Sequence, residues 1–291
     1  MTSGPALSSP LVSTQWLADY LGADKLVVVD ASAIAYTQPN GKPSYFSGHE
    51  TYIINGHIPG AVYADIIDEF SDPDGRYPFT RPDATRFAAA VGALGIDNET
   101  SVVVYDSSVG QWSARLWWLF RSFGYDNVAV LDGGLTKWNL EERPLDTGHI
   151  ELPATTFQVE EREGFWVDKA YVEGIVRGEI DAALVCAAPP KEFTGEAVPR
   201  SRAGHIPGSL SAPASRVVER ESKAFLPVAE LTTTFAPVLD ATRIVTYCGG
   251  AIAASSAAFA LSLLGHTNVA VYDDSLNEWV ADPESELVTT V

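Results

Sequence analysis

One cysteine stands where the sequence could support thiol chemistry. Cys248 follows the apolar run Ile244–Tyr247 and precedes a run of small and apolar residues. That run is Gly249, Gly250, Ala251, Ile252 and Ala253. Glycine has little steric barrier to unusual backbone angles, so the loop can curl until its N–H groups point at one atom. A helix beginning here would add positive potential, which predicts an ionised, nucleophilic thiolate in a cradle that also suits a persulfide or an oxyanion.

Two other interpretations of Cys248 compete with the nucleophile. The first is a small buried hydrophobe that ends a strand. The glycine pair, the expected helix start and the repeat described below favour the nucleophile. The second is a phosphatase loop of the Cys-x5-Arg type, in which the arginine grips phosphate. It is disfavoured because the sixth residue after Cys248 is Ala254, and no arginine follows nearby.

The chain repeats itself. Gly56–Gly60 and Gly204–Gly208 both read Gly-His-Ile-Pro-Gly. The run Val-Val-Val-Tyr-Asp that ends at Asp106 recurs as Ile-Val-Thr-Tyr-Cys ending at Cys248. The matches keep their order at offsets of 141 to 148 positions, which indicates a tandem duplication. Asp106 therefore takes the cysteine position in the first copy, and only one copy keeps a thiol.

Each copy alternates short apolar runs, such as Leu26–Asp30 and Ile244–Tyr247, with helical patterns, such as 112–123 and 253–264. This alternation predicts an α/β fold in which a parallel sheet is covered by helices on both faces. Active sites of such sheets lie at the carboxyl ends of strands, where Cys248 falls.

The repeat predicts two tandem domains. We expect the first domain at residues 1–143, a linker at 144–157 and the second domain, with the thiol, at 158–291. The linker region is polar, contains Pro144 and Pro153, and lacks helical or strand periodicity.

The composition of the chain disfavours several classes of protein and of partner. The 291 residues are 46% apolar, enough for packed cores, with a net charge of −19 and a pI near 4.5. Such acidity disfavours nucleic acid and anionic membranes as partners. No apolar run suits a membrane span or a secretory signal, and two cysteines form no disulfide framework or zinc set. We expect a cytoplasmic protein.

Taken together, the motifs resemble the tandem-domain rhodanese family of thiosulfate and 3-mercaptopyruvate sulfurtransferases. The resemblance covers almost the whole chain. It rests on both Gly-His-Ile-Pro-Gly segments, Tyr247–Gly250, Leu263–His266, Tyr272–Ser275 and Glu278-Trp279. It implies two tandem rhodanese-like domains, the first inactive with Asp106 at the cysteine position. It also implies ping-pong transfer of sulfur through a Cys248 persulfide, with no metal or organic cofactor.

The resemblance also implies the substrates. The donor would be a small anionic sulfur compound, thiosulfate or 3-mercaptopyruvate, and the acceptor would be cyanide, a thiol or a partner protein. Arg200 falls where mercaptopyruvate-type members often carry a second substrate arginine, with Arg202 nearby. Asp65 fits the aspartate of a relay proposed for those members. The relay histidine position holds Phe79, with Arg76 and Arg81 nearby, and this cationic pair could reach from the first domain toward Cys248.

Three positions depart from the mercaptopyruvate-type pattern. Gly250 replaces a loop serine, Ala253 replaces a loop threonine, and Ala188 replaces an arginine that binds the anionic end of the donor. These departures keep a second hypothesis open, a persulfide carrier or partner-delivery protein with weak activity on small donors. A specialised biosynthetic enzyme with a different donor is a third.

The remaining thiol and imidazoles receive structural interpretations. His57 and His205 lie in the two Gly-His-Ile-Pro-Gly turns and are expected to hold those turns rather than act as bases. Cys186 is expected to be buried at a strand end. Its alternative role is a resolving thiol, which requires that it reach Cys248.

Overall fold

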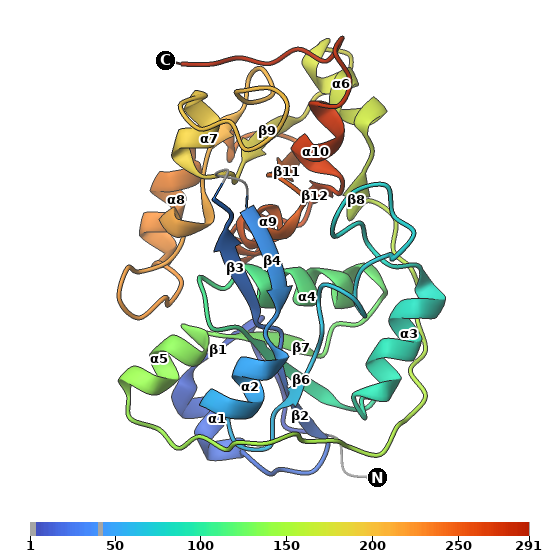
Figure 1. Cartoon of the computed structure of the whole chain (residues 1–291), viewed down its shortest axis with the longest axis vertical. Helices are drawn as coiled ribbons and strands as arrows, with labels where there is room; N and C mark the ends of the chain where they lie inside the picture. The colour runs from blue at the N-terminus through green and yellow to red at the C-terminus, as the bar shows by residue number, and fades with distance from the viewer. Residues whose placement is uncertain (1–3, 40–42, 291) are drawn as a thin grey trace.

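The chain folds into two similar halves, each built on a five-stranded sheet whose strand pairs are all parallel (Figure 1). The structure, a computed structural model, describes residues 4–39 and 43–290. The first sheet has the order β1 (Leu11–Val12), β7 (Val128–Leu131), β6 (Ser101–Tyr105), β2 (Leu26–Asp30) and β5 (Val62–Tyr63). The second has the order β8 (Trp166–Val167), β12 (Val269–Tyr272), β11 (Ile244–Tyr247), β9 (Ala183–Cys186) and β10 (Leu210–Ser211). The two orders match strand for strand.

Helices cover both faces of the sheets, so the predicted α/β architecture is confirmed (Figure 1). In the first half they are α1 (Thr14–Tyr20), α2 (His49–Asn55), α3 (Ala84–Ala93), α4 (Gln111–Ser122) and α5 (Gly134–Leu140). In the second half they are α6 (Lys169–Val176), α7 (Pro190–Thr194), α8 (Val228–Phe235), α9 (Ile252–Leu263) and α10 (Ser275–Trp279). Among the described residues, no helix is long and apolar enough to cross a bilayer.

The strands form where the sequence has apolar runs because both faces of each sheet are covered. Every residue of β6 and of β11 is buried. Side-chain caps then fix where helices begin: the Asp83 carboxylate accepts a hydrogen bond from the backbone N–H of Arg86 at the start of α3. Because β6 is followed closely by α4 and β11 by α9, strand ends and helix starts meet at the carboxyl edge of each sheet.

The two halves share one apolar core. Helices α4 and α9 pack against each other and are buried along most of their length. Around them a single cluster of buried apolar side chains runs from the first half into the second. Because α9 starts just after Cys248, this packing places the cysteine loop beside the boundary between the halves.

A hairpin that the sequence did not predict extends from the first half toward the second (Figure 1). It consists of β3 (Ala33–Thr37) and β4 (Pro43–Ser47), which pair in antiparallel register with Ala35 opposite Tyr45. The Tyr45 ring packs edge-on against Phe79 and Trp112, at centroid distances of 5.4 and 5.5 Å. These aromatic contacts, all within the first half, fix the position of the hairpin.

A buried ion pair fastens the segment around Phe79 to the second sheet. Arg115, 1% exposed, donates from Nη2 to Asp273 Oδ1 at 2.9 Å and to the carbonyl of Phe79 at 2.7 Å. The backbone N–H of Arg81 donates to the other oxygen of Asp273 at 2.8 Å. Removing one partner of such a pair leaves a buried charge, which costs several kcal/mol, so Phe79 is held firmly in place.

The segment expected as a linker, 144–157, lies along the first half. Asp146 pairs with His57 through backbone hydrogen bonds, and the N–H of Thr155 donates to the carbonyl of Gly92 at 2.9 Å. The division of the chain at 144–157 stays a prediction. These contacts indicate that the segment is packed against the first half near both of its ends rather than free.

Candidate active site

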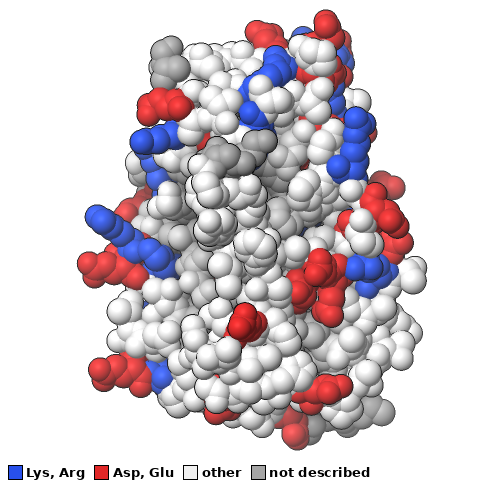
Figure 2. All heavy atoms as spheres, in the orientation of Figure 1, with Lys and Arg blue, Asp and Glu red and all other residues white. Residues whose placement is uncertain are grey.

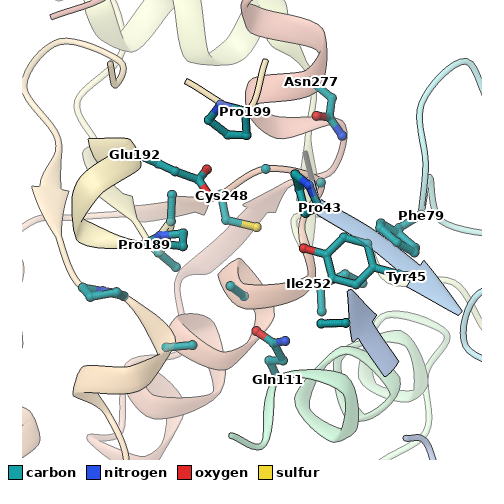
Figure 3. Close-up of a pocket in the computed structure, with 18 of the residues that line it drawn as sticks. Pro43, Tyr45, Phe79, Gln111, Pro189, Glu192, Pro199, Cys248, Ile252 and Asn277 are labelled. Atoms are coloured by element: carbon teal, nitrogen blue, oxygen red, sulfur yellow. The ribbon is translucent and has the colours of Figure 1, made fainter. Parts of the chain in front are cut away.

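Cys248 lies at the carboxyl end of β11, a central strand of the second sheet. Its side chain is 4% exposed and lines a cavity of about 450 Å³ (Figure 3). Ala251, which precedes α9, has a left-handed backbone with φ of 62°, unusual for a residue other than glycine. This turn lets the chain pass from strand to helix within the three residues that follow Cys248.

Backbone N–H groups without protein partners collect in this loop. The amides of Gly249, Gly250, Ile252 and Ala253 have no acceptor within the described chain. The first N–H groups of a helix and the aligned peptide dipoles carry partial positive charge. The loop can therefore stabilise a thiolate, a persulfide anion or a bound oxyanion.

The Ser275 side chain holds the cysteine loop in place through hydrogen bonds. Its Oγ accepts hydrogen bonds from the N–H groups of Cys248 and Ala251, each at 3.2 Å, and donates to the carbonyl of Tyr272 at 2.7 Å. The N–H groups of Leu276 and Asn277 donate to the carbonyls of Cys248 and Gly249. The start of α10 thus sets the shape of the cysteine loop, a role the sequence analysis did not assign to Ser275 or Asn277.

The first half shows what this kind of loop binds. Asp106 occupies the position of Cys248, and its carboxylate accepts six hydrogen bonds of 2.8 to 3.1 Å. The donors are the N–H and Oγ of Ser108, the N–H of Gly110, the N–H of Trp112, and the N–H and Oγ of Ser113. The side chain is 2% exposed. The first loop is therefore filled by its own anion, whereas the second opens onto a cavity.

Arg200, predicted as a substrate residue, lies in the cavity. Its Nη1 contacts Glu192 Oε2 at 2.8 Å and its Nε donates to Asn277 Oδ1 at 3.0 Å. The guanidinium lies against Gly249, where an added methyl group would come within 2.0 Å of Nη2. A larger residue at this position would therefore have to push the end of the arginine side chain aside. Whether Arg200 binds substrate stays a prediction.

Arg202 lies elsewhere, although it is only two residues from Arg200. Its Nη1 donates to the backbone carbonyl of Asp282 at 2.8 Å, and it is not among the residues that line the cavity. That hydrogen bond directs the side chain toward the C-terminal segment, so the structure does not bring Arg202 to Cys248.

The cationic pair suggested for the first half is also directed away from the cavity. The Arg76 guanidinium lies over the ring of its neighbour Tyr77, 5.5 Å from the centroid. Arg81 pairs with Glu161 at 2.6 Å. Neither lines the cavity, whereas Phe79 between them does. The position expected for a relay histidine therefore contributes an apolar wall.

Asp65 has a local structural role. Its Oδ1 accepts hydrogen bonds from the N–H groups of Ile67 and Asp68, at 3.0 and 3.1 Å, and so closes a turn after β5. It does not line the cavity. The structure thus offers no contact between Asp65 and Cys248 through which a relay would run.

The hairpin and nearby loops of the first half complete the cavity. Ala35, Pro43 and Tyr45 come from the hairpin, and Pro78 and Phe79 from the segment before α3. Figure 3 shows Tyr45 and Phe79 on the side of the cavity opposite Glu192 and Pro189, with the Cys248 sulfur between them. The first half therefore lacks a thiol of its own but shapes the space above Cys248.

Cys186 is buried on the opposite face of the second sheet. It lies in register with Tyr247 and belongs with it to one apolar cluster, while Cys248, one residue further on, belongs to the cluster on the other face. Burial raises the pKa of the Cys186 thiol to about 12. A resolving role is disfavoured, because this thiol is protonated at neutral pH and separated from Cys248 by the sheet.

The two turn histidines are structural, as expected. His57 Nδ1 lies 3.1 Å from the carbonyl of Tyr52, and the two rings stack at 3.9 Å. His205 Nδ1 lies 2.8 Å from the carbonyl of Phe193, with a ring stack at 3.6 Å. Neither histidine lines the cavity.

Comparisons with known proteins agree with this geometry. The model of the rhodanese-like domain matches residues 13–141 and 175–282. The chain is 32% identical to a 3-mercaptopyruvate sulfurtransferase of Escherichia coli, over 93% of this chain and 94% of that protein. It is 32% identical to thiosulfate/3-mercaptopyruvate sulfurtransferase 2 of Arabidopsis thaliana, over 97% and 87%. A solved Escherichia coli structure, described as a 3-mercaptopyruvate sulfotransferase with the rhodanese fold, matches with a TM-score of 0.80 at 30% identity, covering 92% and 99%.

Proposed function

Because the chain belongs to the rhodanese family, we propose that Cys248 is the residue through which this sulfurtransferase carries sulfur, as a persulfide. The observation that carries the proposal is the contrast between the two copies of the loop. Asp106 fills the first cradle with its own carboxylate, while Cys248 places a sulfur beside unpartnered amides at an open cavity. A persulfide anion is a charge that such a cradle can stabilise.

The reaction proceeds in two half-reactions. With 3-mercaptopyruvate as donor, the Cys248 thiolate attacks the donor sulfur, an S–S bond forms and the donor C–S bond breaks. The departing carbon takes the thiol proton and leaves as pyruvate, so Cys248 holds a persulfide anion. An acceptor thiol then attacks the outer sulfur, and Cys248 leaves as thiolate while the acceptor becomes a persulfide. Each half-reaction conserves charge and needs no external oxidant.

The composition of the cavity favours 3-mercaptopyruvate over thiosulfate as the small donor. The walls of the cavity are mostly apolar, and Arg200 is the one cationic side chain among the described residues that line it. Several relatives are named for 3-mercaptopyruvate. The acceptors would be thiols, cyanide or a partner protein, and the setting would be the cytoplasm, where thiol acceptors are abundant.

A second candidate function is delivery of sulfur between proteins, with slow turnover of small donors. It is favoured by the missing loop hydroxyls at Gly250 and Ala253 and by Ala188, which is buried and uncharged at the position expected for a substrate arginine. Sulfur uptake from a cysteine desulfurase that is much faster than uptake from either small donor would favour this function.

The proposal is tested by intact-protein mass spectrometry after incubation with 3-mercaptopyruvate or with thiosulfate. Loading should add about 32 Da to the wild type and nothing to Cys248→Ser. Addition of an acceptor thiol should remove the added mass. Failure of both donors to load Cys248 would contradict the role as a small-donor enzyme.

A further inference from the structure

An acidic residue lies beside the one cationic side chain of the cavity. Glu192 in α7 contacts Arg200 at 2.8 Å, and the two side chains are 17% and 18% exposed. Both line the cavity, and no other residue that lines it within the described chain carries a formal charge. Figure 3 shows Glu192 on the wall next to Cys248. Among the described lining residues, the formal charges therefore sum to zero, apart from the cysteine itself.

This pairing changes what Arg200 can offer to a substrate. Glu192 engages Nη1 and Asn277 engages Nε, so both contacts hold the guanidinium against Gly249. At distances that are large compared with the separation of the two groups, the carboxylate also offsets most of the unit charge of the arginine. With a net charge of −19 on the whole chain, an incoming dianion is repelled by the overall field, and the loop amides and the start of α9 offer it only partial positive charge.

The walls of the cavity are suited to an organic molecule. They consist largely of proline, alanine and aromatic side chains, including Pro43, Tyr45, Phe79, Pro189, Pro199 and Ile252. A volume of about 450 Å³ falls in the range of sites for small organic ligands and exceeds what a five-atom anion needs. In Figure 2, most of the middle of this face is uncharged, although a few charged side chains also lie inside its outline.

We propose that Glu192 is a specificity-determining residue that selects organic sulfur compounds with at most one negative charge and discriminates against dianions such as thiosulfate. This inference rests on the proposed function of Cys248 as the sulfur carrier. It assigns to Glu192 a role in the choice of substrate, with no part in the bond-making steps.

The charge dependence gives a quantitative signature. A Coulomb interaction is proportional to the charge of the ligand, so removing the carboxylate helps a dianion twice as much, in free energy, as a monoanion at the same place. Glu192→Gln should raise kcat/KM about fivefold for the singly charged 3-mercaptopyruvate and about 25-fold for thiosulfate, at low ionic strength. Both gains should shrink as salt is added, because the cavity is open to solvent.

Two control variants separate local from general effects. Glu192→Asp keeps the charge and should keep the wild-type preference between donors. Glu230→Gln removes an exposed carboxylate on α8 that does not line the cavity, so it makes the same change in net charge elsewhere. Equal gains for both donors in Glu192→Gln, or a similar gain in Glu230→Gln, would overturn the proposal.

A second measurement needs no sulfur transfer. Iodoacetate and iodoacetamide have nearly the same shape and differ by one negative charge, and alkylation of Cys248 by each can be followed by peptide mass spectrometry. The ratio of the iodoacetate rate to the iodoacetamide rate should rise about fivefold in Glu192→Gln and stay unchanged in Glu230→Gln. An unchanged ratio in Glu192→Gln would refute the role of Glu192. If neither donor loads the wild-type protein, the proposed function fails, and this ratio still decides the role of Glu192.

Discussion

Ser275→Ala is the substitution that most directly probes how the fold shapes the cysteine loop. Its hydroxyl is fully buried, accepts hydrogen bonds from the N–H groups of Cys248 and Ala251, and donates to the carbonyl of Tyr272. Removing it leaves two buried N–H donors and one carbonyl without that partner. Each such group costs about 1–3 kcal/mol, so the two N–H groups alone should lower the free energy of unfolding by about 2–6 kcal/mol.

The loop should also lose its shape for chemistry. Without the Ser275 hydroxyl, the amides around Cys248 are free to turn away from the sulfur. Persulfide formation should therefore slow by about tenfold or more. Urea unfolding measures the first effect, and the rate of mass gain on Cys248 with 3-mercaptopyruvate measures the second.

Ser256→Ala is the matched control. Ser256 lies in α9, is equally buried, and its Oγ has no hydrogen-bond partner within the described chain. Its removal should change the unfolding free energy by less than about 1 kcal/mol and leave loading unchanged. The role assigned to Ser275 is wrong if Ser275→Ala is no more destabilising than Ser256→Ala and loads sulfur at the wild-type rate.

Two further predictions concern a buried carboxyl and a close contact. Burial raises the pKa of Asp30 from 3.8 to about 6, so the folded protein favours the protonated carboxyl. The contribution of Asp30 to the free energy of unfolding is therefore fully present below pH 4 and is lost as the pH rises through 6. Urea unfolding should therefore show Asp30→Asn gaining about 2 kcal/mol relative to wild type between pH 4 and pH 7; a pH-independent difference would contradict this shift. Gly249→Ala should displace Arg200 and raise the KM for 3-mercaptopyruvate about fivefold. The effects of Gly249→Ala and Arg200→Ala on KM should not add, and full additivity would show that the two act separately.

Much of the fold could be predicted because its signals are local. Short apolar runs flanked by helical patterns predicted the parallel sheets, and the expected helices at 112–123 and 253–264 differ from α4 and α9 by one residue at each end. The hairpin β3–β4 was missed because it lacks a buried alternating pattern: Ile34, Tyr36 and Phe46 are exposed. It is held by the packing of Tyr45 on Phe79 and Trp112, contacts between residues far apart in the sequence.

The residues of the site also differ in whether a local sequence signal could reveal them. Cys248 and its glycines could be found because one continuous segment carries the strand end, the loop and the helix start. Ser275 and Glu192 could not, because each acts through a partner distant in the sequence or in another element, which no local pattern reveals. Arg202 has the same residue type as Arg200 two positions away, but a backbone carbonyl near the C-terminus takes its guanidinium.

The central claim is that Cys248 carries sulfur, and the most direct measurement is the mass of the intact protein after brief exposure to 3-mercaptopyruvate, with the modified residue located by peptide mapping. A gain of about 32 Da on Cys248, absent in Cys248→Ser and reversed by an acceptor thiol, is the expected result. An unmodified protein, or the added mass on Cys186, would contradict the claim.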